Sequence, residues 1–209
     1  MPSEPFHVEP LDATFGAMVT DLKLAELDDR AFAELYETWL EYALLVFPAQ
    51  HLSNDEQIAF AKRFGELEFE LTALTNVRED GSIRTSDNDD MVKILKGNMG
   101  WHTDSTYMPV QAKGAVFTAH VVPSKGGETG WADMRAGYRD LDTAMKEKIA
   151  DLSAYHSLYY SQKKFGEMKD KEDSEYFGYG LHGQEPPLRP LVKVHPETRV
   201  TAMTIGRHA

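Results

Sequence analysis

Residues 98–107 read NMGWHTDSTY, and within them His102 and Asp104 are separated by a single residue. In an extended segment, residues two apart point to the same face. The imidazole and the carboxylate are therefore expected to project side by side. This arrangement suits two adjacent positions on an octahedral metal ion, as in the two-histidine, one-carboxylate sites of non-haem Fe(II) oxygenases. Taken alone, the pair also fits a surface histidine beside an aspartate.

The segments around this stretch predict short strands and a few helices. Apolar and β-branched runs predict strands at residues 6–8, 16–19, 43–48, 91–95, 115–122, 191–194 and 201–205. Helical spacing predicts helices over Asp29–Tyr42 and 142–152, and a capping box of Ser53 and Glu56 opens a third helix. Because strands do not alternate regularly with helices, we expect an antiparallel core with helices packed outside it, in one domain over residues 1–209.

Composition excludes several classes of site. The chain has 209 residues, no cysteine and a net charge of −12. Without cysteine there are no disulfides, no thiolate catalysis and no cysteine-ligated metals. An acidic chain repels phosphate backbones, so we expect no nucleic-acid partner. No apolar run has the length of a membrane span and no secretory signal is visible, so we expect no membrane contact and a cytoplasmic location.

The spacing of apolar residues that predicts helices and strands is lost between residues 161 and 188. The sequence there is first charged and then rich in Gly, Tyr and Pro. This segment fits either a solvated surface loop or a lid over a site, because long loops in compact domains are often functional. The other histidines, His156 and His208 among them, are interpreted as packed or solvated side chains. Arg207 is interpreted as a solvated charge.

Three motifs together resemble the TauD/TfdA family of Fe(II)/2-oxoglutarate-dependent dioxygenases. They are the stretch at 98–107, Gly-Gly-Glu-Thr ending at Thr129, and Ala-Asp-Met-Arg-Ala-Gly-Tyr at 132–138. An apolar run ending in Phe-Pro at 46–48, a capped helix ending at Gly65, and the segment 191–209 also look like the family. The resemblance spans nearly the whole chain.

The resemblance implies a fold, cofactors and site residues. The fold is mainly β with flanking helices, a double-stranded β-helix (jelly roll). His102 and Asp104 match two iron ligands, and Thr129 matches the threonine that binds a carboxylate of 2-oxoglutarate. Asn98 matches a position on the substrate side. The implied cosubstrates are 2-oxoglutarate and dioxygen, the implied substrate is a small organic acid of the aryloxyalkanoate or sulfonate kind, and homo-oligomers are common in the family.

The family also places a second iron-binding histidine and a 2-oxoglutarate-binding arginine well downstream, beyond Ala209. We therefore expect the jelly roll to be incomplete at its C-terminus, and the 209-residue chain by itself to be poorly stable and inactive. Two other functions stay open from the residues alone. One is a metal-free jelly-roll protein that binds a small acid or a partner chain. The other is a zinc hydrolase that uses the same His–Asp pair, although zinc sites normally have three protein ligands and a water.

Overall fold

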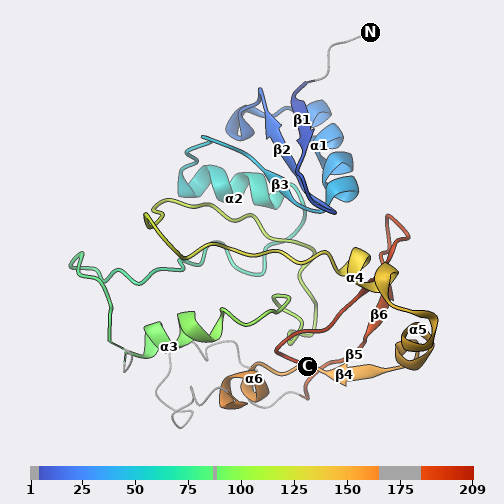
Figure 1. The fold of residues 1–209 in the computed structure, drawn as a ribbon. Helices are drawn as coiled ribbons and strands as arrows, with labels where there is room; N and C mark the ends of the chain where they lie inside the picture. Colours follow the sequence, from blue (N-terminus) through green and yellow to red (C-terminus); the bar gives the residue numbers. More distant parts are fainter. Residues whose placement is uncertain (1–4, 87–88, 165–184) are drawn as a thin grey trace. The chain divides into compact units, whose positions relative to one another are not determined.

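The computed structural model describes residues 5–86, 89–164 and 185–209 (Figure 1). The chain divides into two compact units, which are described separately below. The first comprises Met1–Leu71, Gly114–Asp140 and Val194–Ala202, and the second comprises Thr72–Lys113, Leu141–Lys193 and Met203–Ala209.

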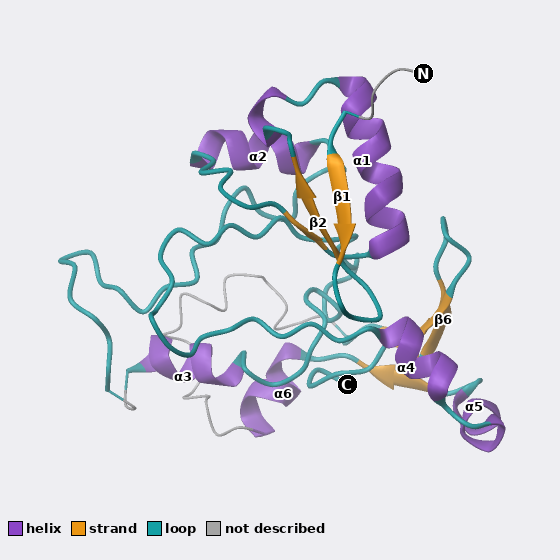
Figure 2. Ribbon diagram, turned by 45° about the horizontal axis from the view of Figure 1, so that its top comes forward, coloured by secondary structure: helices purple, strands orange, loops and turns teal. Residues whose placement is uncertain are grey.

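The first unit is built around a small mixed sheet. Its strands are β1 (His7–Pro10), β2 (Ala17–Thr20) and β3 (Leu45–Val46), in the order β1-β2-β3. β1 and β2 are antiparallel and β2 and β3 are parallel. Strands were expected in all three places, and the structure confirms them. In both ribbon views the helix α1 (Asp29–Tyr42) lies alongside this sheet (Figure 2).

Local sequence signals determine where the helices of this unit begin. The Asp28 side chain accepts a hydrogen bond from the backbone N–H of Ala31 and caps α1. Ser53 and Glu56 form the predicted capping box at the start of α2 (Asn54–Lys62). These helices, the sheet and the short 3-10 helix η1 (Leu24–Glu26) enclose the core of the unit. Its buried apolar side chains are Phe6, Val19, Leu24, Leu35, Leu52 and Phe60.

The prediction of a strand at 115–122 is wrong for this structure. The segment forms no regular strand, and Phe117, Val121 and Val122 are exposed. Its β-branched and aromatic composition favours a strand, but a strand also needs a neighbour that accepts and donates its backbone hydrogen bonds. Within the part of the chain that the structure describes, no strand pairs with it. The helix α4 (Met134–Asp140) follows.

The described part of the second unit contains three short helices and a two-stranded sheet. Residues 91–95, predicted as a strand, lie in a helix, because the Asp89 carboxylate accepts the backbone N–H of Met91 and is itself bound by Arg78 and Arg84. The predicted helix at 142–152 is confirmed in shorter form, with Asp142 as its N-cap. The elements are α3 (Asp90–Gly97), α5 (Thr143–Ile149), β4 (Ser153–Tyr155), α6 (Leu158–Lys164) and β5 (Leu188–Pro190), with β4 and β5 antiparallel.

A C-terminal hairpin confirms the last two predicted strands. β6 (Val192–Val194) and β7 (Thr201–Met203) form a two-stranded sheet, joined by a turn at 196–198. Of the predicted loop at 161–188, the first residues belong to α6 and residues 165–184 lie outside the described residues. No closed barrel is formed by the strands that the structure describes.

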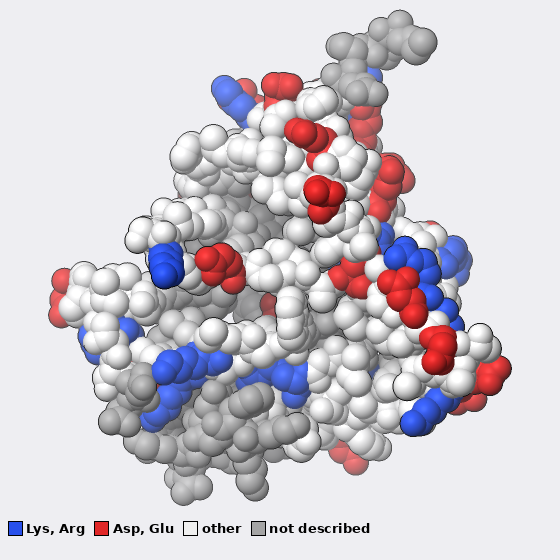
Figure 3. Space-filling model, viewed as in Figure 1, with Lys and Arg blue, Asp and Glu red and all other residues white. Residues whose placement is uncertain are grey.

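The surface carries charges of both signs. Figure 3 shows Asp and Glu side chains spread over the visible face, with Lys and Arg interspersed in small groups. Among the described residues, no helix is both long enough and apolar enough to cross a membrane.

Candidate metal centre

His102 and Asp104 lie side by side in the second unit. The Nε2 atom of His102 is 3.1 Å from Oδ1 of Asp104. Two ligands at neighbouring positions of an octahedral ion, each about 2.1 Å from it, lie roughly 3 Å apart. The two atoms therefore already have the separation that a shared metal ion requires. The Asp104 side chain is 76% exposed and that of His102 is 21% exposed, so an ion can reach the pair from solvent.

A turn, and not the strand alternation that the sequence suggested, directs the two side chains. Residues 101–103 have no regular secondary structure and residues 104–107 form turns. Ser105 has a left-handed backbone with φ of 58°. The backbone N–H of Met108 donates to the Ser105 carbonyl at 3.0 Å. The side-by-side arrangement is as expected, but its cause is the tight turn that follows Asp104.

The ring of His102 is held in one orientation by the backbone. Its Nδ1 atom is 2.6 Å from the carbonyl oxygen of Gly100. Because a carbonyl can only accept, Nδ1 carries the proton in this contact and Nε2 faces Asp104. Histidine ligands of metals usually donate their second ring N–H to such a carbonyl, which fixes the tautomer and the ring plane. The residues present therefore fit a metal ion bound at Nε2.

The electrostatics of the pair also favour a cation between the two side chains. The hydrogen bond that the His102 ring donates to the Asp104 carboxylate raises the pKa of His102, against the smaller effect of burial. The same contact lowers the pKa of Asp104. Without a metal, the two groups are therefore stabilised as an imidazolium and a carboxylate that share a proton. A divalent cation would take the place of this proton.

The described residues supply two candidate ligands, His102 and Asp104. Among them, no group of three His, Cys, Asp or Glu side chains is placed to hold a metal ion. A site of this kind leaves several coordination positions to other oxygen or nitrogen donors. That matches the chemistry of a non-haem iron site, in which open positions receive a chelating cosubstrate and dioxygen.

The segment after β7 packs directly against the backbone of the ligand pair. The backbone N–H of Arg207 donates to the carbonyl of Trp101 at 2.9 Å. A Cβ atom placed on Gly206 would lie 2.9 Å from the Cα atom of His102 and 3.2 Å from the Trp101 carbonyl oxygen. Only glycine allows so close an approach, and the His102 backbone is thereby confined.

Gly206→Ala is expected to displace the backbone of His102 and to weaken binding of Mn(II) roughly tenfold, which is the range found when groups that orient metal ligands are lost. Mn(II) affinity is measured from the electron paramagnetic resonance (EPR) signal of the free ion during a titration. Ile205→Ala is the control, because it shortens a half-exposed neighbour and adds no atom near His102. An unchanged affinity in Gly206→Ala would contradict the expectation.

A buried histidine, His208, lies next to the pair. Its ring centroid is 5.6 Å from that of His102 and 4.9 Å from that of Tyr107. The Ser161 hydroxyl donates to the Leu158 carbonyl at 2.8 Å, so it accepts from Nδ1 of His208 at 2.9 Å. Burial lowers the pKa of His208 to about 4, so its ring is neutral at physiological pH.

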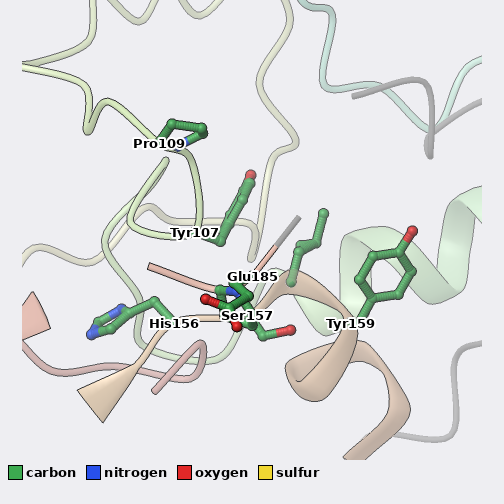
Figure 4. Close-up of a pocket in the computed structure, with 8 residues that line it drawn as sticks. Tyr107, Pro109, His156, Ser157, Tyr159 and Glu185 are labelled. Atoms are coloured by element: carbon green, nitrogen blue, oxygen red, sulfur yellow. The ribbon is translucent and has the colours of Figure 1, made fainter. Parts of the chain in front are cut away.

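A second buried histidine, His156, lines a cavity of the same unit. It is 1% exposed, and within the described structure neither ring nitrogen has a hydrogen-bond partner. Figure 4 shows this cavity, with His156 on one side and Tyr107, Tyr159 and Glu185 among the other lining residues. The interpretation of His156 and His208 as packed histidines is confirmed.

Because His156 is buried, the free energy of unfolding is expected to fall at acidic pH. Burial lowers the pKa of His156, and the nearby cations Arg189 and Lys193 lower it further. An unfolded histidine takes up its proton below about pH 6.5. The unfolded state therefore binds more protons in that range, and the free energy of unfolding falls as the pH drops below about 6.5.

His156→Leu is expected to reduce this fall, since the variant has no imidazole to protonate on unfolding. Urea unfolding at pH 7.5, 6.5 and 5.5 measures it. The neutral, buried His208 also lowers the free energy of unfolding at acidic pH, in the wild type and in the variant alike. The pH dependence is therefore expected to become smaller in His156→Leu but not to disappear. His120→Leu removes an exposed histidine and serves as the control. Equal pH dependence in His156→Leu and the wild type would refute the prediction.

The other two predicted site residues are placed differently. Asn98 lies in the second unit, in the turn after α3, four residues before His102. Thr129 lies in the first unit, in an exposed irregular segment before α4. The structure thus brings His102 and Asp104 together in the second unit, whereas Thr129 belongs to the first unit.

Sequence reasoning missed how Arg207 is placed. Its Nε and Nη1 atoms are buried, so its interpretation as a solvated charge is wrong. Its charge opposes protonation of both His102 and His208. About a hundred residues separate Arg207 from His102, and no local pattern links them. The family-like motif Ile-Gly-Arg-His-Ala at 205–209, which contains Arg207, was the only signal that could have suggested a role.

Comparisons with known proteins place this chain among dioxygenases. A family model described as "Taurine catabolism dioxygenase TauD, TfdA family" matches residues 7–209. An (S)-phenoxypropionate/alpha-ketoglutarate-dioxygenase of Sphingobium herbicidovorans is 64% identical over 208 residues, which are 99% of this chain and 72% of the relative. A protein of the same name from Delftia acidovorans is 54% identical, covering 97% of this chain and 72% of the relative.

A solved structure resembles nearly the whole chain. It is AAD-2 in complex with Mn(II) and N-oxalylglycine. The alignment has a TM-score of 0.86 and 33% sequence identity, and it covers 98% of this chain and 72% of AAD-2.

Proposed function

This chain belongs to the TauD/TfdA dioxygenase family, and from that premise we propose that His102 and Asp104 bind its Fe(II). The protein is an Fe(II)- and 2-oxoglutarate-dependent dioxygenase that acts on a small organic acid. The observation that carries the site assignment is the 3.1 Å separation of Nε2 and Oδ1, with Nδ1 of His102 turned to the Gly100 carbonyl.

The proposed substrates are 2-aryloxyalkanoates, with (S)-2-phenoxypropionate first among them. The two relatives with 64% and 54% identity carry that activity in their names. A relative named 2,4-dichlorophenoxyacetate dioxygenase is 32% identical, whereas the relative named alkylsulfatase is only 26% identical. The gradient in identity favours aryloxy acids over sulfonates and sulfate esters.

When bound, Fe(II) with 2-oxoglutarate and dioxygen supplies the oxidant that places one oxygen atom on a substrate C–H group, and 2-oxoglutarate leaves as succinate and carbon dioxide. Hydroxylation at the ether carbon of 2-phenoxypropionate gives a hemiketal. The hemiketal loses the phenol as its C–O bond breaks, and the alkanoate becomes a 2-oxoacid.

The residues of this chain bind and orient the reactants. Asp104 contributes one negative charge to the metal, and His102 contributes a neutral nitrogen whose direction Gly100 fixes. We propose that the Thr129 hydroxyl donates to a carboxylate of 2-oxoglutarate and that Asn98 lines the substrate side. The partly buried cation Arg207 beside His102 makes these surroundings favourable for an acid substrate.

We propose further that residues 1–209 belong to one dioxygenase domain with a jelly-roll fold. The match of the family model over residues 7–209 and the TM-score of 0.86 to AAD-2 support this proposal. The cytoplasmic location and the homo-oligomer stay predictions.

The test is succinate formation by the protein that carries this sequence, with Fe(II), 2-oxoglutarate and air. (S)-2-Phenoxypropionate, its (R)-enantiomer, phenoxyacetate and an alkanesulfonate are compared. We expect the aryloxy acids to raise succinate formation above the rate without substrate, with one phenol released per succinate. If only the sulfonate stimulates succinate formation, the substrate class is wrong. If no acid does so while 2-oxoglutarate alone is consumed, the proposed substrates are all excluded.

A further inference from the structure

A cation on β5 binds the turn that carries Asp104. Arg189 donates from Nε to the carbonyl oxygen of Thr106 at 2.6 Å and from Nη2 to that of Met108. These carbonyls lie two and four residues after Asp104. A guanidinium group donates from a rigid, planar fork, so it fixes the two carbonyls relative to each other as well as to β5.

A second cation extends the same contact. Lys193, four residues after Arg189, donates from Nζ to Oε1 of Gln111 at 2.9 Å. Residues 189–193 thus bind residues 106–111 at three points. Burial lowers the pKa of Arg189 and of Lys193, which shows that placing these charges here costs free energy. Hydrogen bonds to carbonyl oxygens offset that cost, and their loss would leave buried polar groups unsatisfied.

The turn itself needs such support. Ser105 is 6% exposed and Thr106 is 2% exposed, so both are packed inside the unit. Ser105 has a φ of 58°, a conformation that is unfavourable for any residue with a Cβ atom. Strained backbone persists only where surrounding contacts hold it in place. The Arg189 fork is such a contact, and it acts on the residues immediately after Asp104.

We propose that Arg189 is a positioning residue of the metal centre, which holds the turn at 104–108 so that the Asp104 carboxylate faces Nε2 of His102. The inference rests on the proposed role of His102 and Asp104 as metal ligands. Arg189 does not touch the metal in this proposal. It acts through the backbone of Thr106 and Met108.

The experiment measures metal affinity directly, by EPR titration with Mn(II), and thermal stability in parallel. Arg189→Met keeps the length of the side chain but removes both donors. We expect its dissociation constant for Mn(II) to rise roughly tenfold, as when groups that orient metal ligands are removed. Arg189→Lys keeps the charge but can serve only one carbonyl well, so an intermediate rise is expected. The visible absorption of the Co(II) protein, which reports ligand geometry, is expected to change in both variants.

Arg135→Met is the matched control. Arg135 is also half-buried and donates from Nη1 to a backbone carbonyl, that of Glu41, at 3.0 Å, but it belongs to the first unit. We expect it to lower the melting temperature and to leave Mn(II) affinity and the Co(II) spectrum unchanged. If Arg189→Met fails to fold, Arg189→Lys carries the test.

The outcomes separate this inference from the proposed function. Mn(II) affinity within twofold of the wild type in both Arg189 variants overturns the inference. An equal loss of affinity in Arg135→Met also overturns it, because the effect would then follow general stability. If His102→Ala does not weaken Mn(II) binding, the proposed metal site is wrong, and the role of Arg189 is wrong with it.

Discussion

His102→Ala is expected to lower the rate of substrate-dependent succinate formation by more than 100-fold and to weaken Mn(II) binding by a similar factor. Losing a group that merely orients a metal ligand costs 10–100-fold, so losing the ligand itself costs more. The described residues provide only the pair with Nε2 and Oδ1 3.1 Å apart. With the imidazole removed, Asp104 alone is left to hold the ion from this segment.

Asp104→Ala is also expected to lower the rate of succinate formation and to weaken Mn(II) binding, for a second reason. The carboxylate neutralises part of the metal charge, and a neutral site holds a divalent ion less well. Succinate is measured by chromatography, and metal affinity by the EPR titration. His120→Ala, which removes an exposed histidine, is expected to keep wild-type values. Activity within tenfold of the wild type in either ligand variant would show that iron is bound elsewhere.

Leu35→Ala is expected to lower the free energy of unfolding by about 2–5 kcal/mol, the range for truncating a fully buried leucine. Leu35 is 0% exposed and lies on α1 in the core of the first unit. The truncation removes apolar contacts and leaves a cavity, which the surrounding helices and sheet fill only in part. Denaturation with urea, followed by circular dichroism, measures the change.

Aromatic side chains pack closely in the same core as Leu35. The rings of Phe32, Phe60 and Phe64 pack edge to face, with centroids 5.0–6.4 Å apart. The guanidinium group of Arg63 lies 4.1 Å above the Phe32 ring. Leu71→Ala, at a site 42% exposed, is the control and is expected to change stability by less than about 0.5 kcal/mol. A loss below 1 kcal/mol in Leu35→Ala would mean that the core repacks.

The elements that the sequence predicted well are those with local causes. The capping box of Ser53 and Glu56 involves residues three apart, and it forms as expected. The same holds for α1, whose apolar spacing and Asp28 cap lie within one segment. The strands of the C-terminal hairpin were also found, because a turn at 196–198 joins two adjacent apolar runs.

The two strands predicted wrongly depended on distant partners or on a short pattern. Residues 91–95 are apolar enough for a strand, but the contacts of Asp89 with Arg78, Arg84 and the Met91 N–H begin a helix there. Residues 115–122 have strand composition without a pairing strand among the described residues. A short apolar run does not by itself distinguish helix from strand.

The sequence by itself placed His102 and Asp104 one residue apart, and the motifs around that pair indicated the family. Only the tertiary structure decided what holds the pair in place. Gly206 lies against the His102 backbone, His208 packs beside the His102 ring, and Arg189 binds the turn after Asp104. Each of these contacts joins residues at least 83 positions apart. No periodicity or spacing records them, because they arise only when packing brings distant segments together.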